Sequence, residues 1–185
     1  MTVGNETWIF GSGSLMWNPG FDHLEVQPAL LRGYHRAFCI YSHYAWGTLE
    51  RPGLVLGLLP GGSCRGRAFC IAREQTESVL AYLDDRESAP YRRVLVPVAL
   101  RERTVEAHTY VANPDHRQFA GKLTPEPAAD FILQGKGHRG SSREYLQNTV
   151  RHLDELGIRE GPLHRLLDLV EMAGSAARTR CGDSP

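Results

Sequence analysis

Thr7-Trp8-Ile9-Phe10 is a short apolar run that stops at Gly11-Ser12-Gly13-Ser14, and Leu15 follows. An apolar run of this length that ends at glycine predicts a buried strand leading into a loop. The loop carries little side-chain bulk, so its backbone N–H groups can come close to a ligand. A plain tight turn is the alternative, and these residues leave both interpretations open.

Two common motif classes are excluded at this loop. Met16 stands where a dinucleotide-binding fingerprint needs its third glycine, and the lysine of a phosphate-binding loop is missing. Ser12 and Ser14 lack the glycines two positions before and after that mark a nucleophile elbow. The loop therefore predicts neither a nucleotide site of these types nor a nucleophilic serine.

Outward from the loop, strand-like runs dominate the first two thirds of the chain. The expected strands cover residues 26–31, 34–41, 94–100 and 104–111. Leu54–Leu59 and Arg67–Ile71 are separated by Pro60-Gly61-Gly62, which predicts a hairpin. Helical patterns dominate the last third, and this order favours an α+β fold over a regular βαβ alternation.

The clearest early helix is expected from Thr76 to about Glu87, where Ala89-Pro90 ends it. Three further helices are expected, from Pro125, from the capping-box sequence Ser141-Ser142-Arg143-Glu144 and from Pro162.

Glu87 is an acidic residue on the apolar stripe of the first of these helices, four residues after Leu83. Burial and the negative end of the helix dipole would both raise the pKa of its carboxyl group. A carboxyl group of that kind can exchange a proton near neutral pH. The alternative is a surface carboxylate paired with Arg86, Arg92 or Arg93.

Length and composition predict one globular domain over residues 1–185, with an ordered core of about 6–174 and a frayed tail over 175–185. Lys and Arg together number 21, as do Asp and Glu. Because a nucleic-acid binder normally carries a basic excess, this balance argues against nucleic acid as a partner.

Membrane and metal signals are also missing from the sequence. No apolar run approaches the 18 or more residues of a membrane span, and residues 1–6 lack a signal-peptide pattern, so we expect a cytoplasmic protein. The chain has no C-x-x-C pair and no H-E-x-x-H motif, so neither a metal nor another cofactor is expected.

Five stretches in this order resemble the ChaC-type γ-glutamylcyclotransferases, and the resemblance covers most of the chain. They are Trp8–Trp17, Leu31–Tyr34 with Phe38–Ser42, Glu50–Leu58, Tyr82–Glu87, and Ser142–Leu146 with Gly157-Ile158 beyond it.

The resemblance implies a mixed β-barrel with flanking helices and a lyase that cleaves glutathione to 5-oxoproline and cysteinylglycine without a cofactor. It also implies that Glu87 is the catalytic acid and base, and that a small-molecule substrate is the partner. The implied substrate-binding residues are Ile9, Phe10, Gly11, Ser12, Gly13, Ser14 and Leu15. Tyr145 is a further substrate-binding candidate, with simple packing as its alternative.

The chain departs from the family pattern at two positions. Ser12 stands where the family loop usually has tyrosine, and Trp46-Gly47 stands where Arg-Gly is expected. These differences bear on the choice of substrate. Cyclotransfer on other γ-glutamyl amines or peptides therefore remains an alternative function, as does a non-catalytic regulator that binds the γ-glutamyl group.

Overall fold

The structure of the chain is a computed structural model that describes residues 6–182. It divides into two compact units. The first comprises the chain up to Ala37 together with Gly57–Phe119, and the second comprises Phe38–Leu56 together with the chain from Ala120 onward. The single domain expected over residues 1–185 stays a prediction.

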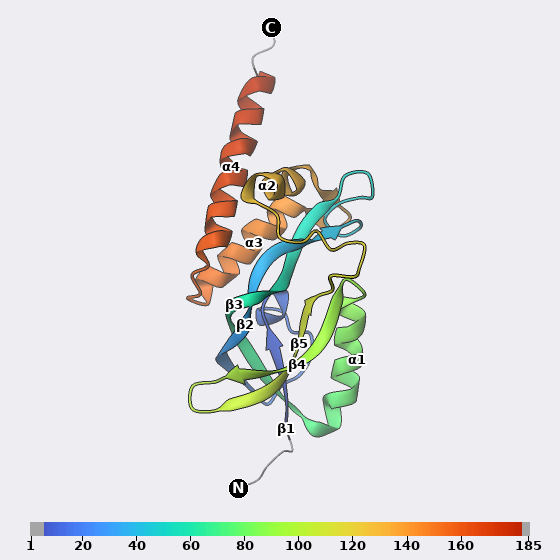
Figure 1. The fold of residues 1–185 in the computed structure, drawn as a ribbon, viewed down its shortest axis with the longest axis vertical. Coiled ribbons are helices and arrows are strands. Elements are labelled where there is room, and N and C mark those ends of the chain that lie inside the picture. The colour runs from blue at the N-terminus through green and yellow to red at the C-terminus, as the bar shows by residue number, and fades with distance from the viewer. Residues whose placement is uncertain (1–5, 183–185) are drawn as a thin grey trace. The chain divides into compact units, whose positions relative to one another are not determined.

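The first unit is built on a closed β-barrel with the strand order β1-β3-β2-β4-β5 (Figure 1). The strands are β1 (Glu6–Gly11), β2 (Glu25–Ser42), β3 (Gly53–Ala72), β4 (Tyr91–Ala99) and β5 (Thr104–Ala112). β1 pairs antiparallel with β3, placing Phe10 opposite Ala68, and parallel with β5, placing Ile9 opposite His108. The parallel pairing makes the barrel mixed, as predicted.

The predicted hairpin through Pro60-Gly61-Gly62 is wrong, because β3 runs without reversal from Gly53 to Ala72. Gly61 and Gly62 have φ angles of 98° and 71°. Glycine adopts such left-handed backbone easily, and here it bends one long strand instead of folding it back. The two strands expected over 26–31 and 34–41 likewise form the single strand β2.

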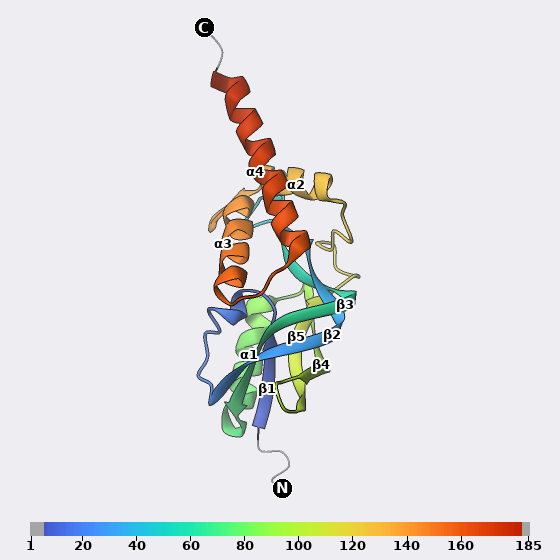
Figure 2. The ribbon, with the colours of Figure 1, turned by 90° about the vertical axis from the view of Figure 1, so that its left-hand side faces the viewer.

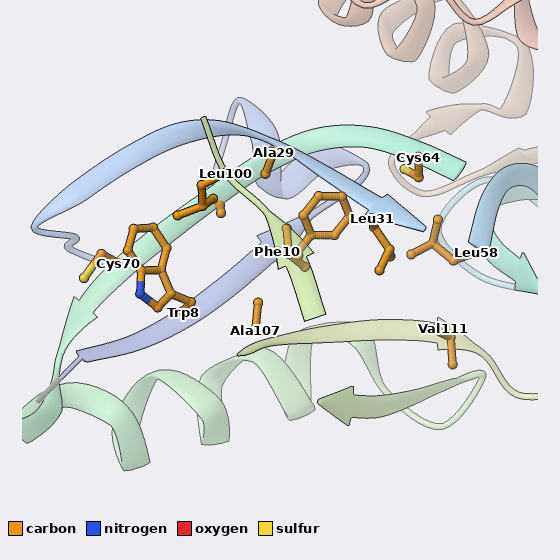
Figure 3. Close-up of a cluster of buried hydrophobic side chains, with 12 residues drawn as sticks. Trp8, Phe10, Ala29, Leu31, Leu58, Cys64, Cys70, Leu100, Ala107 and Val111 are labelled. Carbon is orange, nitrogen blue, oxygen red and sulfur yellow. The ribbon is translucent and has the colours of Figure 1, made fainter. Parts of the chain in front are cut away.

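Alternate residues of β1 serve two apolar clusters, because neighbouring side chains of a strand point to opposite faces. Trp8 and Phe10 belong to the cluster drawn in Figure 3, together with Leu31 of β2 and Val111 of β5. Ile9 belongs to a second cluster on the other face of the strand. Its buried members are Ile9, Leu15, Phe69, Ile71, Val79, Leu83 and Tyr110.

The second cluster fixes α1 (Thr76–Glu87), which lies along the barrel in both ribbon views (Figures 1 and 2). Val79 and Leu83 are its buried residues, one turn apart, as the sequence pattern indicates. Because Glu87 lies one further turn along the helix, this packing decides where its carboxyl group is held.

The second unit contains the ends of β2 and β3 together with a two-stranded sheet and three helices. These elements are α2 (Pro125–Gln134), β6 (Lys136–Gly137), β7 (Gly140–Ser141), α3 (Ser142–Glu155) and α4 (Gly161–Gly182). The capping box that predicted the start of α3 is present. The Ser141 hydroxyl accepts from the Glu144 N–H at 3.1 Å, and the Glu144 carboxylate accepts from the Ser141 N–H at 2.7 Å.

Helix α4 continues to Gly182. The frayed tail expected over residues 175–185 stays a prediction. Alanine is the best helix former, and Ala173 and Ala176 keep the helix favourable across Gly174. Residues 183–185 lie outside the described residues. None of the helices described is both long and apolar enough to cross a membrane.

Candidate active site

The loop after β1 turns back over the end of the strand. Gly11 ends β1, and the 3₁₀ helix Ser14–Met16 follows after two residues. A Cβ atom on Gly11 would lie 3.0 Å from the Cβ of Leu15, so a side chain at this position would crowd the returning loop. Leu15 and Met16 are buried, and their side chains anchor the turn in the protein interior.

Helix α1 ends abruptly after Glu87. The next residue, Ser88, has φ 57° and ψ −172°, a backbone conformation that is close to glycine-only. Its N–H still donates to the Asp84 carbonyl at 3.0 Å, which closes the last turn. Glu87 is therefore held in helical backbone, directly before a strained residue that stops the helix.

The carboxyl group of Glu87 is largely shielded from water, with a side chain that is 19% exposed. Burial raises its pKa above the ordinary value, and the nearby Arg86 guanidinium opposes this rise. Arg86 Nε lies 3.9 Å from Glu87 Oε1. The other two partners considered in the surface alternative pair elsewhere, Arg92 with Asp115 and Arg93 with Asp84.

Arg86 joins the end of α1 to the loop after β1. Its Nη2 donates to the Ser14 hydroxyl at 3.0 Å, and its Nη1 donates to the carbonyls of Asn18 at 2.8 Å and Pro19 at 3.0 Å. Arg86, the neighbour of the predicted acid Glu87, thus links the end of α1 to the predicted loop within the first unit. The sequence offered Arg86 only as a charge partner for Glu87, so its role in the loop was missed.

Two further arginines hold the loop from the barrel, and sequence reasoning missed both. Arg36 of β2 is 4% exposed and donates from Nε to the Ser12 carbonyl. Arg67 of β3 donates from Nη1 to the Met16 carbonyl at 2.9 Å. A signal for Arg36 was present in the sequence, since it interrupts an aromatic-rich strand, and a charge in such a strand is uncommon.

Tyr145 belongs to the second unit, on the first turns of α3. Its ring lies 5.8 Å from the ring of Phe38 and 5.1 Å from that of Trp46, centroid to centroid. Trp46, one of the two departures from the family pattern, is thus part of the aromatic packing around Tyr145. The role of Tyr145 in binding substrate stays a prediction.

Within residues 6–182, no group of three or more histidine, cysteine, aspartate or glutamate side chains could hold a metal ion. Cys39 and Cys70 are buried free thiols. Burial raises the pKa of the Cys39 thiol to about 12 and that of Cys70 to about 11, so neither is an activated thiolate.

The closed mixed barrel is the γ-glutamylcyclotransferase fold. The chain superposes with a TM-score of 0.83 on a γ-glutamylcyclotransferase specific to glutathione from yeast, with 24% sequence identity. The match covers 91% of this chain and 99% of the yeast chain. The fold class predicted from the sequence is confirmed.

The ChaC-like protein family model matches residues 7–173, and the chain belongs to this family. It is 34% identical over 163 residues to the glutathione-specific γ-glutamylcyclotransferase of Escherichia coli K12, covering 86% of this chain and 71% of that protein. It is 30% identical over 164 residues to γ-glutamylcyclotransferase 2-3 of Arabidopsis thaliana, covering 83% and 82%. The resemblance drawn from the sequence is confirmed.

Proposed function

We propose that the chain is a γ-glutamylcyclotransferase that cleaves glutathione to 5-oxoproline and cysteinylglycine. The observation that carries the proposal is the shielded carboxyl group of Glu87, whose pKa is raised by burial, at a helix end that Arg86 joins to the loop after β1. Family membership and the names of the relatives support the same reaction.

In the first step, the substrate's own α-amine is the nucleophile, so the protein needs no nucleophilic side chain. Glu87 in its carboxylate form takes a proton from the ammonium group. The freed nitrogen attacks the γ-carbonyl carbon, and a new C–N bond closes the five-membered ring. A raised pKa makes the Glu87 carboxylate a better match for the amine than an ordinary carboxylate is.

In the second step, the tetrahedral intermediate collapses and the γ-amide C–N bond breaks. The carboxyl group of Glu87 returns its proton to the departing amine of cysteinylglycine, which leaves Glu87 ready for the next turnover. The atoms of glutathione are divided between the two products, and water is not consumed.

The loop after β1 supplies the hydrogen-bond donors in this proposal. The first N–H groups of a helix have no partner inside the helix, which applies here to Ser14 and Leu15 at the start of the 3₁₀ helix. Together with the Gly13 N–H, they stabilise the oxyanion that forms on the γ-carbonyl. The ring closes within one molecule. Holding the substrate folded back therefore lowers the activation barrier by up to roughly 7–11 kcal/mol.

The direct test is the release of 5-oxoproline from glutathione by the purified chain and by Glu87→Gln. We expect the wild type to release it and Glu87→Gln to lose activity while keeping its fold, as judged by circular dichroism. Asp85→Asn is the matched control, because Asp85 is an exposed carboxylate on the same helix turn. Release at the wild-type rate by Glu87→Gln would remove this residue from the mechanism.

The substrate range is tested in the same assay with γ-glutamyl dipeptides beside glutathione. Turnover of the dipeptides at a comparable kcat/KM would broaden the proposal to γ-glutamyl compounds in general. Tight binding of glutathione without any product would favour the non-catalytic regulator.

A cytoplasmic location is part of the proposal. Its support is the two buried free thiols Cys39 and Cys70, since cysteines outside disulfides are typical of a reducing compartment.

A further inference from the structure

Six carbonyl groups of the loop after β1 accept hydrogen bonds from donors of the protein. Three arginines from three different elements donate to four of these carbonyls. Arg36 donates to that of Ser12, Arg67 to that of Met16, and Arg86 to those of Asn18 and Pro19. The Gly13 carbonyl accepts from the Met16 N–H at 2.9 Å, and the Ser14 carbonyl accepts from the Asn18 N–H at 2.8 Å. These six carbonyl oxygens therefore point toward donors of the protein.

The hydrogen bond of Arg36 to the Ser12 carbonyl bears directly on the N–H groups that are proposed to bind the oxyanion. Its Nε donates to the Ser12 carbonyl and its Nη2 to the Arg65 carbonyl, so one planar guanidinium spans the loop and β3. Met16 Sδ lies 3.5 Å from the same Nη2. With 4% of the residue exposed, this guanidinium has little freedom to move.

The Ser12 carbonyl and the Gly13 N–H belong to the same peptide unit. In a planar trans peptide, the C=O and N–H groups point in opposite directions. Fixing the Ser12 oxygen on Arg36 therefore turns the Gly13 N–H away from Arg36. Hydrogen bonds in a chain also polarise one another, so a charged donor on the oxygen strengthens the N–H as a donor.

We propose that Arg36 is a positioning residue that aims and polarises the Gly13 N–H toward the oxyanion of the reaction. This rests on the proposed function, because the oxyanion belongs to that chemistry. A charged group placed in a barrel wall is costly, and an apolar residue of similar size would pack there at lower cost. Orienting the Ser12–Gly13 peptide unit is the role that offsets this cost in the proposal.

The test compares kcat and KM for glutathione in Arg36→Met and Arg36→Lys. Removing one oxyanion donor typically costs 10² to 10³ in kcat. We expect about a 10²-fold loss in kcat for Arg36→Met, with KM within threefold of the wild type. Arg36→Lys keeps a charged donor that reaches the Ser12 carbonyl alone, so we expect a loss of about tenfold.

A control separates positioning from general loss of stability. Val98→Ala shortens a fully buried side chain of β4 in the barrel cluster, whose buried members include no residue of the loop after β1. It should lower the melting temperature and leave kcat unchanged. If Arg36→Met and Arg36→Lys both keep kcat within threefold of the wild type, or if Val98→Ala loses kcat equally, the proposal is wrong.

A second readout does not depend on turnover. In ¹⁵N–¹H spectra, the Gly13 amide proton should move upfield in Arg36→Lys, because its peptide oxygen loses part of its charged partner, and should stay in place in Val98→Ala. If the wild type releases 5-oxoproline but Arg36→Lys changes neither the chemical shift of the Gly13 amide proton nor kcat, this inference fails and the proposed function stands. If the wild type turns over no γ-glutamyl compound, both fail.

Discussion

The guanidinium of Arg86 donates to the hydroxyl of Ser14 at 3.0 Å, and this contact ties the last turn of α1 to the 3₁₀ helix after β1. The same guanidinium lies beside the carboxyl group of Glu87. One side chain therefore both anchors the loop and acts on the charge of the proposed acid and base.

Replacing Arg86 should change the pH dependence of the reaction. Arg86 lowers the pKa of Glu87 against the larger effect of burial. Without this cation the pKa rises further, so the acid limb of kcat/KM in Arg86→Met should move to higher pH, and kcat should fall. The pH–rate profile measures both effects. The control is Arg92→Met, which removes a surface ion pair with Asp115. An acid limb that stays in place or moves to lower pH would contradict the assigned interaction.

Glu87→Gln should be more stable than the wild type at neutral pH. Because the pKa of Glu87 is raised in the folded state, folding favours its protonated form. Below the unfolded-state pKa, near 4.5, the carboxyl group is protonated in both the folded and the unfolded state and does not lower the free energy of unfolding. As the pH rises through the folded-state pKa, stability is lost.

Thermal unfolding at two pH values measures this effect. The melting temperature of Glu87→Gln should exceed that of the wild type at pH 7.5, and the difference should vanish near pH 4. Asp85→Asn, which changes an exposed carboxylate, should show no such pH-dependent gain. A gain for Glu87→Gln that is as large at pH 4 as at pH 7.5 would argue against burial as its cause.

Ser88→Gly should stabilise the fold. The backbone of Ser88 lies in a region that costs a residue other than glycine about 1–3 kcal/mol. Glycine gives back about 0.5–1 kcal/mol through its greater freedom in the unfolded chain, which leaves a net gain of about 1 kcal/mol. Urea unfolding measures it, and Ser88→Ala, which keeps the strain, should gain nothing.

Ser142→Ala should be among the more damaging single-atom deletions in the second unit. The Ser142 hydroxyl donates to the Leu54 carbonyl at 2.6 Å and accepts from the Leu54 N–H at 3.0 Å. Its loss leaves two buried backbone groups without this partner, at a cost of about 2–4 kcal/mol. Ser141→Ala, which removes the helix cap, should cost about 1 kcal/mol. Denaturant midpoints of the two variants should show this order.

Much of the fold could be predicted because local patterns report on it directly. The periodic apolar residues of 76–87 and the capping box at Ser141 gave α1 and the start of α3 with correct boundaries. The hairpin failed because Pro60-Gly61-Gly62 is compatible with both a reversal and a bend. Which of the two occurs depends on the neighbouring strands, and a local pattern does not contain that information.

The candidate site was predictable only in part. The placement of Glu87 on an apolar stripe indicated a shielded carboxyl group, and the structure shows that environment. The arginines that hold the loop were missed because their partners are backbone carbonyls. The contact between Arg36 and Ser12 joins residues 24 positions apart, and that between Arg86 and Asn18 joins residues 68 apart. Carbonyls are present at every residue, so no residue type marks the partner.

The parallel rung between Ile9 and His108 closes the barrel. Strands that present unsatisfied N–H and C=O groups along one side invite pairing with other molecules, and closing a sheet on itself removes that hazard. The barrel should therefore resist strand-templated aggregation at high concentration, and this protection should disappear once the short β1 strand detaches.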